Sequence, residues 1–500
     1  MSMTEKRVTL ITSVGSALEY YDFITYILLA SYLSQVFFPE SDPIAGSLET
    51  LAVFAIAYIA RPVGGLIFGH FGDKFGRKKV FLASILLMAA STFAIGLLPS
   101  YHAIGVLGAI LLVVLRTIQG LSQGAELPGA ITFIAEHASR TKRGSQLGLM
   151  MFGVALGAML STLVNLILHY NLDTAQFITW GWRIPFLIGG VLAIVGFYLR
   201  RSIPESPIFI DHKDTLDEPL PEAQVQRFFK IMNLCLLVLL GIAGFYVLSM
   251  IYTFQARLPS WNWLVNLGGF FILVALVYGV YKWLVNWNVY INFRAGLVKE
   301  PFSMVISSQH KPLLQGIGIT IFPASFILFA LFLPSYLDTY YTYSSTHVYL
   351  AMTLSLLWSA LLLPLFGWFS DFIGRKRLFI SAAIIAIVTI YSLFQLLTFG
   401  EVANVYGFMF LYQTIVAMLA ACYPSQLAEL FSTKVRYTGV GICYNVSFCI
   451  AAFIPMLAVS LLSLTHYRLV VSFIFIILGI LSLITVWTTY ERSNRQLKAN

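Results

Sequence analysis

The sequence contains few charged residues and few cysteines. Charged side chains make up 11% of its 500 residues, whereas soluble domains usually carry about a quarter. Hydrophobic residues make up 59%, and the mean hydropathy is +0.83. The four cysteines, at positions 235, 422, 443 and 449, lie inside apolar segments without paired spacing. The composition indicates a polytopic membrane protein, and the cysteines indicate neither a disulfide framework nor a metal site.

The sequence also lacks the patterns of nucleic-acid-binding proteins and enzymes. Lys and Arg outnumber Asp and Glu by 31 to 22, but they form short clusters between apolar runs instead of a basic stripe. No nucleophile with a base, metal-ligand spacing or phosphate-binding loop is present. We therefore expect no enzymatic activity, no cofactor, no metal and no nucleic-acid partner.

Apolar runs long enough to cross about 30 Å of hydrocarbon occur in two sets of six. The first set lies near 12–37, 48–71, 79–98, 104–135, 146–169 and 183–199, and the second near 313–336, 347–369, 378–398, 403–428, 437–463 and 468–489. Only about ten polar residues precede the first run, and no small-residue cleavage site follows a short core. We expect this run to be the first membrane helix and to be retained in the mature protein.

Charged turns repeat between the two sets. GHFGDKFGRKKV at 69–80 returns as GWFSDFIGRKR at 367–377. Gly69, Asp73, Gly76 and Arg77 map onto Gly367, Asp371, Gly374 and Arg375 with an offset of 298, and Glu136, Ser139 and Arg143 map onto Glu429, Ser432 and Arg436 with an offset of 293. The repetition indicates an internal duplication.

The offset is too long for six helices with short loops, so extra material lies between the halves. Residues 200–230 are polar and contain prolines, and two further apolar runs follow near 231–253 and 264–286. Tryptophans bracket the second run like an interfacial belt, at positions 261, 263, 283 and 287. The predicted fold is an all-α polytopic membrane protein with two six-helix bundles and two inserted transmembrane helices, fourteen spans in all. The alternative is that the two runs are amphipathic surface helices, but neither shows a charged face.

The predicted domains follow from this count. They are 1–200 for the N-terminal bundle, 201–311 for the linker and inserted helices, 312–490 for the C-terminal bundle and 491–500 for the tail. Most basic residues fall on one side of the predicted spans, whereas the opposite loops carry mainly acidic residues. The positive-inside rule therefore predicts that both termini are cytoplasmic.

The repeated turn has a composition that a stop-transfer signal alone does not explain. Its glycines allow helices to approach closely, and Asp73 can reach the positive N-terminal end of a neighbouring helix while Arg77 stays in water. The turn resembles the cytoplasmic signature loop of the major facilitator superfamily. Further stretches resemble its metabolite:proton symporter family, which includes bacterial carriers of dicarboxylates, citrate, shikimate, proline and betaine. These stretches are SALEYYDFITY (16–26), RTIQGLSQGAELPGA (116–130), AEHASRTKRG (135–144), GWRIPFLIGG (181–190), RRSIPESPIF (200–209) and YPSQLAELFSTKVRYTGVGICYN (423–445).

The resemblance implies twelve core helices around a central cavity that opens alternately to either side of a bacterial inner membrane. It also implies a cytoplasmic gate built from Gly69, Asp73, Gly76, Arg77, Glu136, Arg143, Asp371, Gly374, Arg375, Glu429 and Arg436. Two features depart from the family. The family usually has a plain linker where this chain has two extra spans, which leaves oligomerisation through them open. A Gly-Gly-Glu of the fourth helix reads Gly124-Ala125-Glu126 here, which bears on substrate identity.

Two carboxylates in the first helix are candidates for proton coupling. Glu19 and Asp22 lie three residues apart and therefore share a face, and neither has a basic residue one turn away. An ionised carboxylate without a partner is costly in hydrocarbon, which suits a group that takes up and releases protons. The alternative role is hydrogen bonding between helices near the membrane surface.

The fourth helix carries a polar stripe. Arg116, Gln119, Gln123 and Glu126 fall within a band about 80° wide and about 15 Å long, which we expect to face a wet cavity. The guanidinium of Arg116 suits a carboxylate, so Arg116 is the leading candidate for binding an anionic substrate group. Internal pairing of Arg116 with Glu19, Asp22 or Glu126 is the alternative.

Other candidates rank behind these residues. Arg61 is a weaker candidate for the same anionic group, and Tyr26 and Tyr336 are candidates to line the cavity. Asp22 and Glu126 are the leading proton sites, ahead of Glu19.

These features favour a proton-coupled importer of a small polar metabolite, a carboxylate or a zwitterion, with the metabolite, protons and membrane lipid as its partners. An efflux antiporter shares the fold and differs in the direction of coupling. A membrane sensor without transport activity would need a signalling domain, and the largest cytoplasmic segment is a linker of about 30 residues without a known motif.

Overall fold

The computed structural model describes residues 3–38, 53, 56–69, 71, 77–201, 305, 309–341, 343 and 345–490. The chain divides into two compact units, 1–211 together with 309–500, and 212–308. Apart from residue 305, all of the described residues belong to the first unit. The two predicted inserted spans and the C-terminal tail lie outside the described residues, and so do Asp73 and Gly76.

Every described element is helical. The first half contains α1 (Met3–Leu28), α2 (Ala30–Phe37), the helix Ile56–Gly69, α4 (Arg77–Leu97), α5 (Tyr101–Ile104), α6 (Val106–His137), α7 (Arg143–Asn171), α8 (Thr174–Gln176), the π-helical turn η1 (Phe177–Gly181) and α9 (Arg183–Arg201). The second half contains α14 (His310–Tyr340), α15 (Ser345–Ile373), α16 (Arg375–Leu396), η4 (Leu397–Phe399), α17 (Val402–Leu430), η5 (Thr433–Val435), α18 (Arg436–Ala451), α19 (Ile454–Thr465) and α20 (Val470–Trp487).

Among the described residues, a helix lies in each of the twelve apolar runs predicted for the two halves, and the run near 48–71 contains the helix Ile56–Gly69. The run near 12–37 is divided between α1 and α2 at Leu29, and the run near 437–463 is divided between α18 and α19. Nine helical segments among the described residues are long and apolar enough to cross a membrane. The first helix, α1, is not among them, because Glu19, Asp22 and its serines and threonines lower its hydropathy. An apolar run therefore predicts a helix well, but polar functional residues weaken the membrane signal of the helix that carries them.

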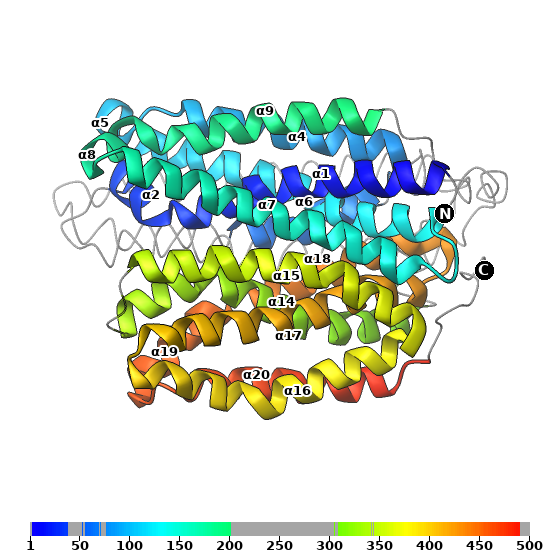
Figure 1. Ribbon diagram of the computed structural model, residues 1–500. Helices are drawn as coiled ribbons and strands as arrows, with labels where there is room; N and C mark the ends of the chain where they lie inside the picture. The colour runs from blue at the N-terminus through cyan, green and yellow to red at the C-terminus, as the bar shows by residue number, and fades with distance from the viewer. Residues whose placement is uncertain are drawn as a thin grey trace, which may run out of the picture. The chain divides into compact units, whose positions relative to one another are not determined.

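The two halves meet along long helices (Figure 1). The main contact pairs α7 with α15, and further contacts join α17 to α7 and α18 to α6. Glycines let the backbones of α7 and α15 approach closely: a β-carbon at Gly148 would lie 2.8 Å from the carbonyl oxygen of Leu363 and 3.1 Å from the Cα of Gly367. Small residues are the usual means of close helix contact in membranes, so this seam is specified by residues that a hydropathy scan does not detect.

Candidate functional site

The buried charges of the described residues form two groups of equal size. The inner cluster consists of Glu19, Asp22 and Glu126 with Arg61, Arg116 and Arg200. The gate cluster consists of Glu136, Asp371 and Glu429 with Arg143, Arg375 and Arg436. The inner cluster belongs entirely to the first half, whereas the gate cluster is shared between the halves. Each cluster holds three acidic and three basic side chains, so neither carries a net charge when all of its groups are ionised.

Crossed ion pairs dominate the gate cluster. Arg143 at the start of α7 donates from Nη1 to Glu429 Oε1 of α17 at 2.6 Å, and Arg436 at the start of α18 donates from Nη1 to Glu136 Oε1 of α6 at 2.7 Å. Each arginine also holds its own half, because Nε donates to the carbonyl oxygen eight residues before it, at 3.2 Å in the first half and 3.0 Å in the second. The duplicated sequence thus produces two equivalent bridges, in which each half supplies the arginine for the carboxylate of the other.

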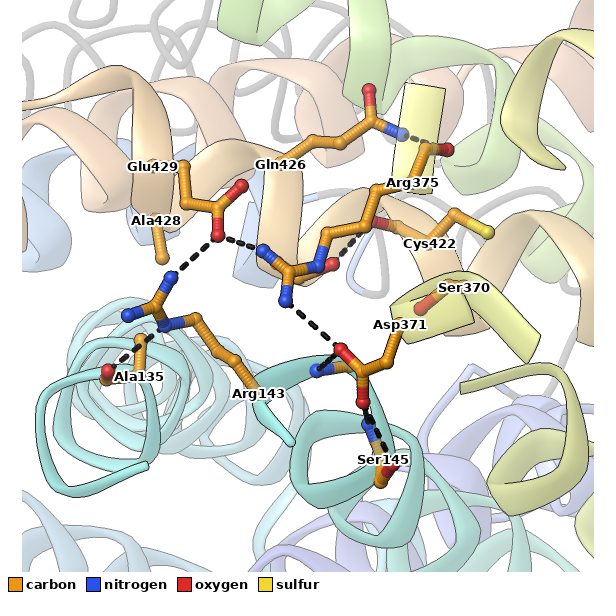
Figure 2. A network of polar contacts seen from close by, with 12 residues as sticks. Ala135, Arg143, Ser145, Ser370, Asp371, Arg375, Cys422, Gln426, Ala428 and Glu429 are labelled. Carbon is orange, nitrogen blue, oxygen red and sulfur yellow. Dashed lines mark hydrogen bonds and ion pairs between the residues drawn. The ribbon is translucent and has the colours of Figure 1, made fainter. Parts of the chain in front are cut away.

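Asp371 and Arg375 extend this network (Figure 2). Arg375 pairs with Glu429, and its Nη2 lies 2.9 Å from Asp371 Oδ1. Asp371 also accepts hydrogen bonds of 2.8 Å from the backbone N–H groups of Gly144 and Ser145, and one of 2.7 Å from Ser145 Oγ. The Asp371 carboxylate therefore caps the N-terminus of α7 in the other half, where the helix dipole favours a negative charge.

Of the remaining predicted gate residues, the structure describes Gly69, Arg77 and Gly374. Gly374 has a φ of 103° between α15 and α16, a conformation that requires glycine. Gly69 ends its helix against α18, and a β-carbon there would lie 3.4 Å from Thr438 Cα. Arg77 begins α4, but its side chain lies outside the described residues.

In the inner cluster, the side-chain amide of Gln119 bridges Asp22 to Arg116. Asp22 Oδ2 accepts hydrogen bonds of 2.5 Å from Thr92 Oγ1 and from Gln119 Nε2. Gln119 Oε1 in turn accepts a hydrogen bond of 2.5 Å from Arg116 Nη1. The guanidinium of Arg116 also lies 3.9 Å from the centroid of the Tyr26 ring. This arrangement agrees with the alternative of internal pairing for Arg116, through Gln119 instead of direct contact.

Arg61 occupies an aromatic setting. Its Nη2 donates to Gln123 Oε1 at 2.7 Å, and its guanidinium lies 4.3 Å from the Phe23 ring centroid and 4.4 Å from that of Tyr58. Among the described residues, neither Arg61 nor Arg116 has a carboxylate within ion-pair distance. Both guanidinium groups are therefore held by amides and aromatic rings, and some of their N–H donors have no partner among the described residues.

Arg200 is a buried residue that sequence reasoning missed. Its position in the sequence groups it with the basic residues of the linker, but its side chain is buried and its Nη1 lies 3.6 Å from Glu126 Oε2. Glu19 neighbours the same carboxyl group and feels the charge of Arg200. The sequence carries no signal that separates Arg200 from the exposed Arg201 beside it.

The polar stripe of α6 is enclosed by the first half. Its four side chains are fully buried and bind partners within that half. A small, mostly apolar cavity lies between the halves, and Tyr20, Ala158, Ser359 and Gln413 are among its lining residues. Tyr336 packs against Phe329 and Phe394 and donates to the carbonyl oxygen of Arg468 at 3.3 Å, so its contacts lie within the second half and not beside Arg116.

Comparison with known proteins agrees with this architecture. Residues 8–219 match the family model described as sugar (and other) transporter, and residues 316–500 match that of the major facilitator superfamily. A putative metabolite transport protein of Haemophilus influenzae is 30% identical over 499 residues, covering 98% of this chain and 95% of the relative. The proline/betaine transporter of Escherichia coli K12 is 29% identical over 494 residues, covering 97% and 83%.

A solved structure shows the same fold. The proton:xylose symporter XylE, bound to 6-bromo-6-deoxy-D-glucose, superposes with a TM-score of 0.71 at 19% identity, covering 99% of this chain and 98% of the other. From these similarities over nearly its whole length, we conclude that the chain belongs to the major facilitator superfamily of membrane transporters.

Proposed function

We propose that the protein is a proton-coupled transporter that imports a small metabolite bearing a carboxylate group, as an anion or a zwitterion, across the bacterial inner membrane. The names of its relatives support this class: they include a proline/betaine transporter and a glycine betaine/proline/ectoine/pipecolic acid transporter. Proline and the betaines are zwitterions with one carboxylate. An exporter of the same fold would differ in the direction of coupling, which a transport assay measures.

The observation that carries the proposal is a set of buried donors without acceptors. Among the described residues, these hydrogen-bond donors have no partner: Arg61 Nε, Arg116 Nε, Arg116 Nη2 and Gln123 Nε2. A buried donor left unsatisfied costs about 1–3 kcal/mol, and guanidinium forks match carboxylate geometry. We therefore place the substrate carboxylate between Arg61 and Arg116.

Tyr20 connects this place to the cavity between the halves. Its side chain lines the cavity, and Arg61 and Glu19 lie within electrostatic reach of its hydroxyl group. The apolar lining suits the hydrocarbon body of a small metabolite, while the carboxylate reaches the arginines of the first half.

Charge balance links the substrate to protons. The inner cluster holds three carboxyl groups and three guanidinium groups. An anionic substrate, or a zwitterion whose cationic group lies outside the cluster, would add a fourth negative charge to this buried site, which is unfavourable unless a proton neutralises one of the four. Protonation of an inner carboxyl and binding of the substrate therefore favour each other, which is the thermodynamic requirement for symport.

We assign to the gate cluster the opening and closing of the transporter on one side of the membrane. Its crossed pairs join the ends of α6, α7, α17 and α18, which supports a state closed on the side of the repeated turns. We assign this side to the cytoplasm from the positive-inside rule. Substrate release there would require these pairs to break.

The proposed architecture retains fourteen spans and the domain boundaries 1–200, 201–311, 312–490 and 491–500, with both termini cytoplasmic. The inserted spans are the proposed place for contacts between copies of the chain. This part rests on the apolar runs near 231–253 and 264–286.

Uptake by proteoliposomes tests the function. We expect accumulation of proline, glycine betaine or a small carboxylate when the outside is made acidic, and no accumulation without a gradient. Arg116→Lys keeps the charge but removes the planar fork, so it should weaken binding at least tenfold, whereas the exposed Arg377→Lys should not. Failure of every carboxylate-bearing compound to accumulate, with the protein folded, would refute the proposal.

A further inference from the structure

Four helices build a buried position for Arg200 near the end of α9. Its side chain is 2% exposed, and its guanidinium lies 4.1 Å from the centroid of the Phe81 ring of α4. Glu126 of α6 lies 3.6 Å from its Nη1. Gly15 of α1 makes the room: a β-carbon there would collide with the guanidinium group of Arg200. The arginine is therefore enclosed, although it stands at a helix end where an arginine usually extends into water.

Two carboxyl groups share this one guanidinium. Glu19 and Glu126 are both buried and neighbour each other, and the positive charge of Arg200 interacts electrostatically with both. Among the described residues, Glu19 Oε2, both oxygens of Glu126, and Nε and Nη2 of Arg200 have no hydrogen-bond partner. If both glutamates were ionised, the group would carry an excess negative charge. One proton between the two carboxyls removes that excess.

Other ionisable groups of the described residues face this trio. Asp22 and Tyr20 come from α1, Arg61 from its helix, and Tyr437 and Tyr444 from α18. Asp22 differs from the glutamates because Thr92 and Gln119 already satisfy one of its oxygens. The glutamate pair is therefore chemically distinct from Asp22.

We propose that Glu19, Glu126 and Arg200 form a second proton-binding site, in which one proton is shared by the two carboxyl groups and Arg200 positions them. This inference deepens the proposed proton-coupled transport and rests on it. Along α6, Glu126 lies about 10 Å beyond Gln119 and about 15 Å before Glu136. The site therefore stands between Asp22 and the gate cluster, where a proton taken from water on one side is returned to water on the other.

The test compares accumulation driven by a pH gradient with exchange of labelled substrate between equal pools. Arg200→Gln removes the guanidinium that, among the described residues, forms an ion pair with Glu126, so we expect the carboxyl pair to keep its proton throughout the cycle. We expect accumulation to fall at least tenfold while exchange stays within twofold. Arg200→Lys should restore at least half of the accumulation, and the exposed neighbour Arg201→Gln should behave as the wild type.

Two further comparisons separate the shared site from simple loss of structure. Gly15→Ala should reproduce the loss of accumulation by displacing the guanidinium, whereas Gly196→Ala of α9 meets only the end of the Leu18 side chain, at 3.3 Å, and should have little effect. Glu19→Gln and Glu126→Gln should each lower accumulation as much as the double substitution, because the two groups hold one proton.

The outcomes distinguish this inference from the proposed function. Absence of proton-driven accumulation in the wild type would refute the proposed function itself. Normal accumulation in Arg200→Gln, or additive losses for the two glutamates, would refute only the second proton site. Equal loss of exchange and accumulation in Arg200→Gln, with unchanged thermal unfolding, would also refute it, because the role would then lie in substrate binding.

Discussion

The side-chain amide of Asn445 donates a hydrogen bond of 2.8 Å to the carbonyl oxygen of Gly124, joining α18 of the second half to α6 of the first. Pro128 stands four residues after Gly124 and has no N–H group, so α6 cannot supply the usual donor for this carbonyl. Tyr437 makes a second bond, of 2.8 Å, to the carbonyl oxygen of Ala125. The contact between the halves is thus built on the backbone that immediately precedes Glu126.

Asn445→Ala should weaken this contact. The buried carbonyl of Gly124 would lose its donor, at a cost of about 1–3 kcal/mol. We expect a lower unfolding temperature and a larger population that is open at the gate cluster. Spin labels at Thr141 and Lys434, in the turns that precede α7 and α18, report the opening as a longer distance. Asn171→Ala is the control, because Asn171 is exposed and donates within its own helix, to the carbonyl oxygen of Ile167. An unchanged distance distribution would show that the bond is incidental to gating.

Glu429→Gln should open the gate cluster more strongly. Arg143 and Arg375 would then be buried without their shared carboxylate, and breaking a buried pair costs about 3–5 kcal/mol. Glu136→Gln should act in the same direction, because the two bridges are equivalent. The same spin-label pair measures the effect, with the exposed Glu401→Gln as the control. A closed distance distribution in both variants would contradict the role of the crossed pairs.

Asp371→Asn should slow transport while leaving substrate binding nearly intact. The carboxylate caps α7 and pairs with Arg375, so we expect it to stabilise one conformation and not to bind the substrate. We expect Asp73→Asn to act in the same sense and more strongly. Equilibrium binding measured beside transport rate checks this, and an equal loss of both would count against a gating role.

Asp22→Asn and Glu126→Gln should abolish accumulation driven by a pH gradient while sparing exchange. A carboxyl group couples protons to transport only if its proton affinity changes with substrate occupancy or with the open side. Exposed Asp173→Asn provides the matched control. If both variants still concentrate substrate under a proton gradient alone, these carboxylates are structural.

Reporter fusions test the proposed span count. A reporter after Asp214 should lie inside the cell, and one after Ser260, between the proposed inserted spans, should lie outside. Two reporters on the cytoplasmic side would indicate surface helices and a twelve-span architecture.

The sequence by itself determined the helices and the duplication. Long apolar runs must form helices in hydrocarbon because every backbone polar group needs an internal partner there. The constant offsets of the repeated turns also placed Glu136, Arg143, Glu429 and Arg436 in equivalent positions, and the structure brings all four together. The four residues of the crossed pairs could therefore be named from the sequence, and their gating role stays a prediction.

Only the tertiary structure decided how the charges pair. Nothing in the spacing shows that Arg143 reaches the Glu429 of the other half, that Gln119 stands between Asp22 and Arg116, or that Arg200 is buried while Arg201 is exposed. Helical periodicity gives the face on which a residue lies, but not which helix covers that face. A buried charge takes the partners that packing brings to it, which are a carboxylate for Arg143 and an amide with aromatic rings for Arg61. The pairing therefore depends on how the helices pack, which the local sequence does not specify.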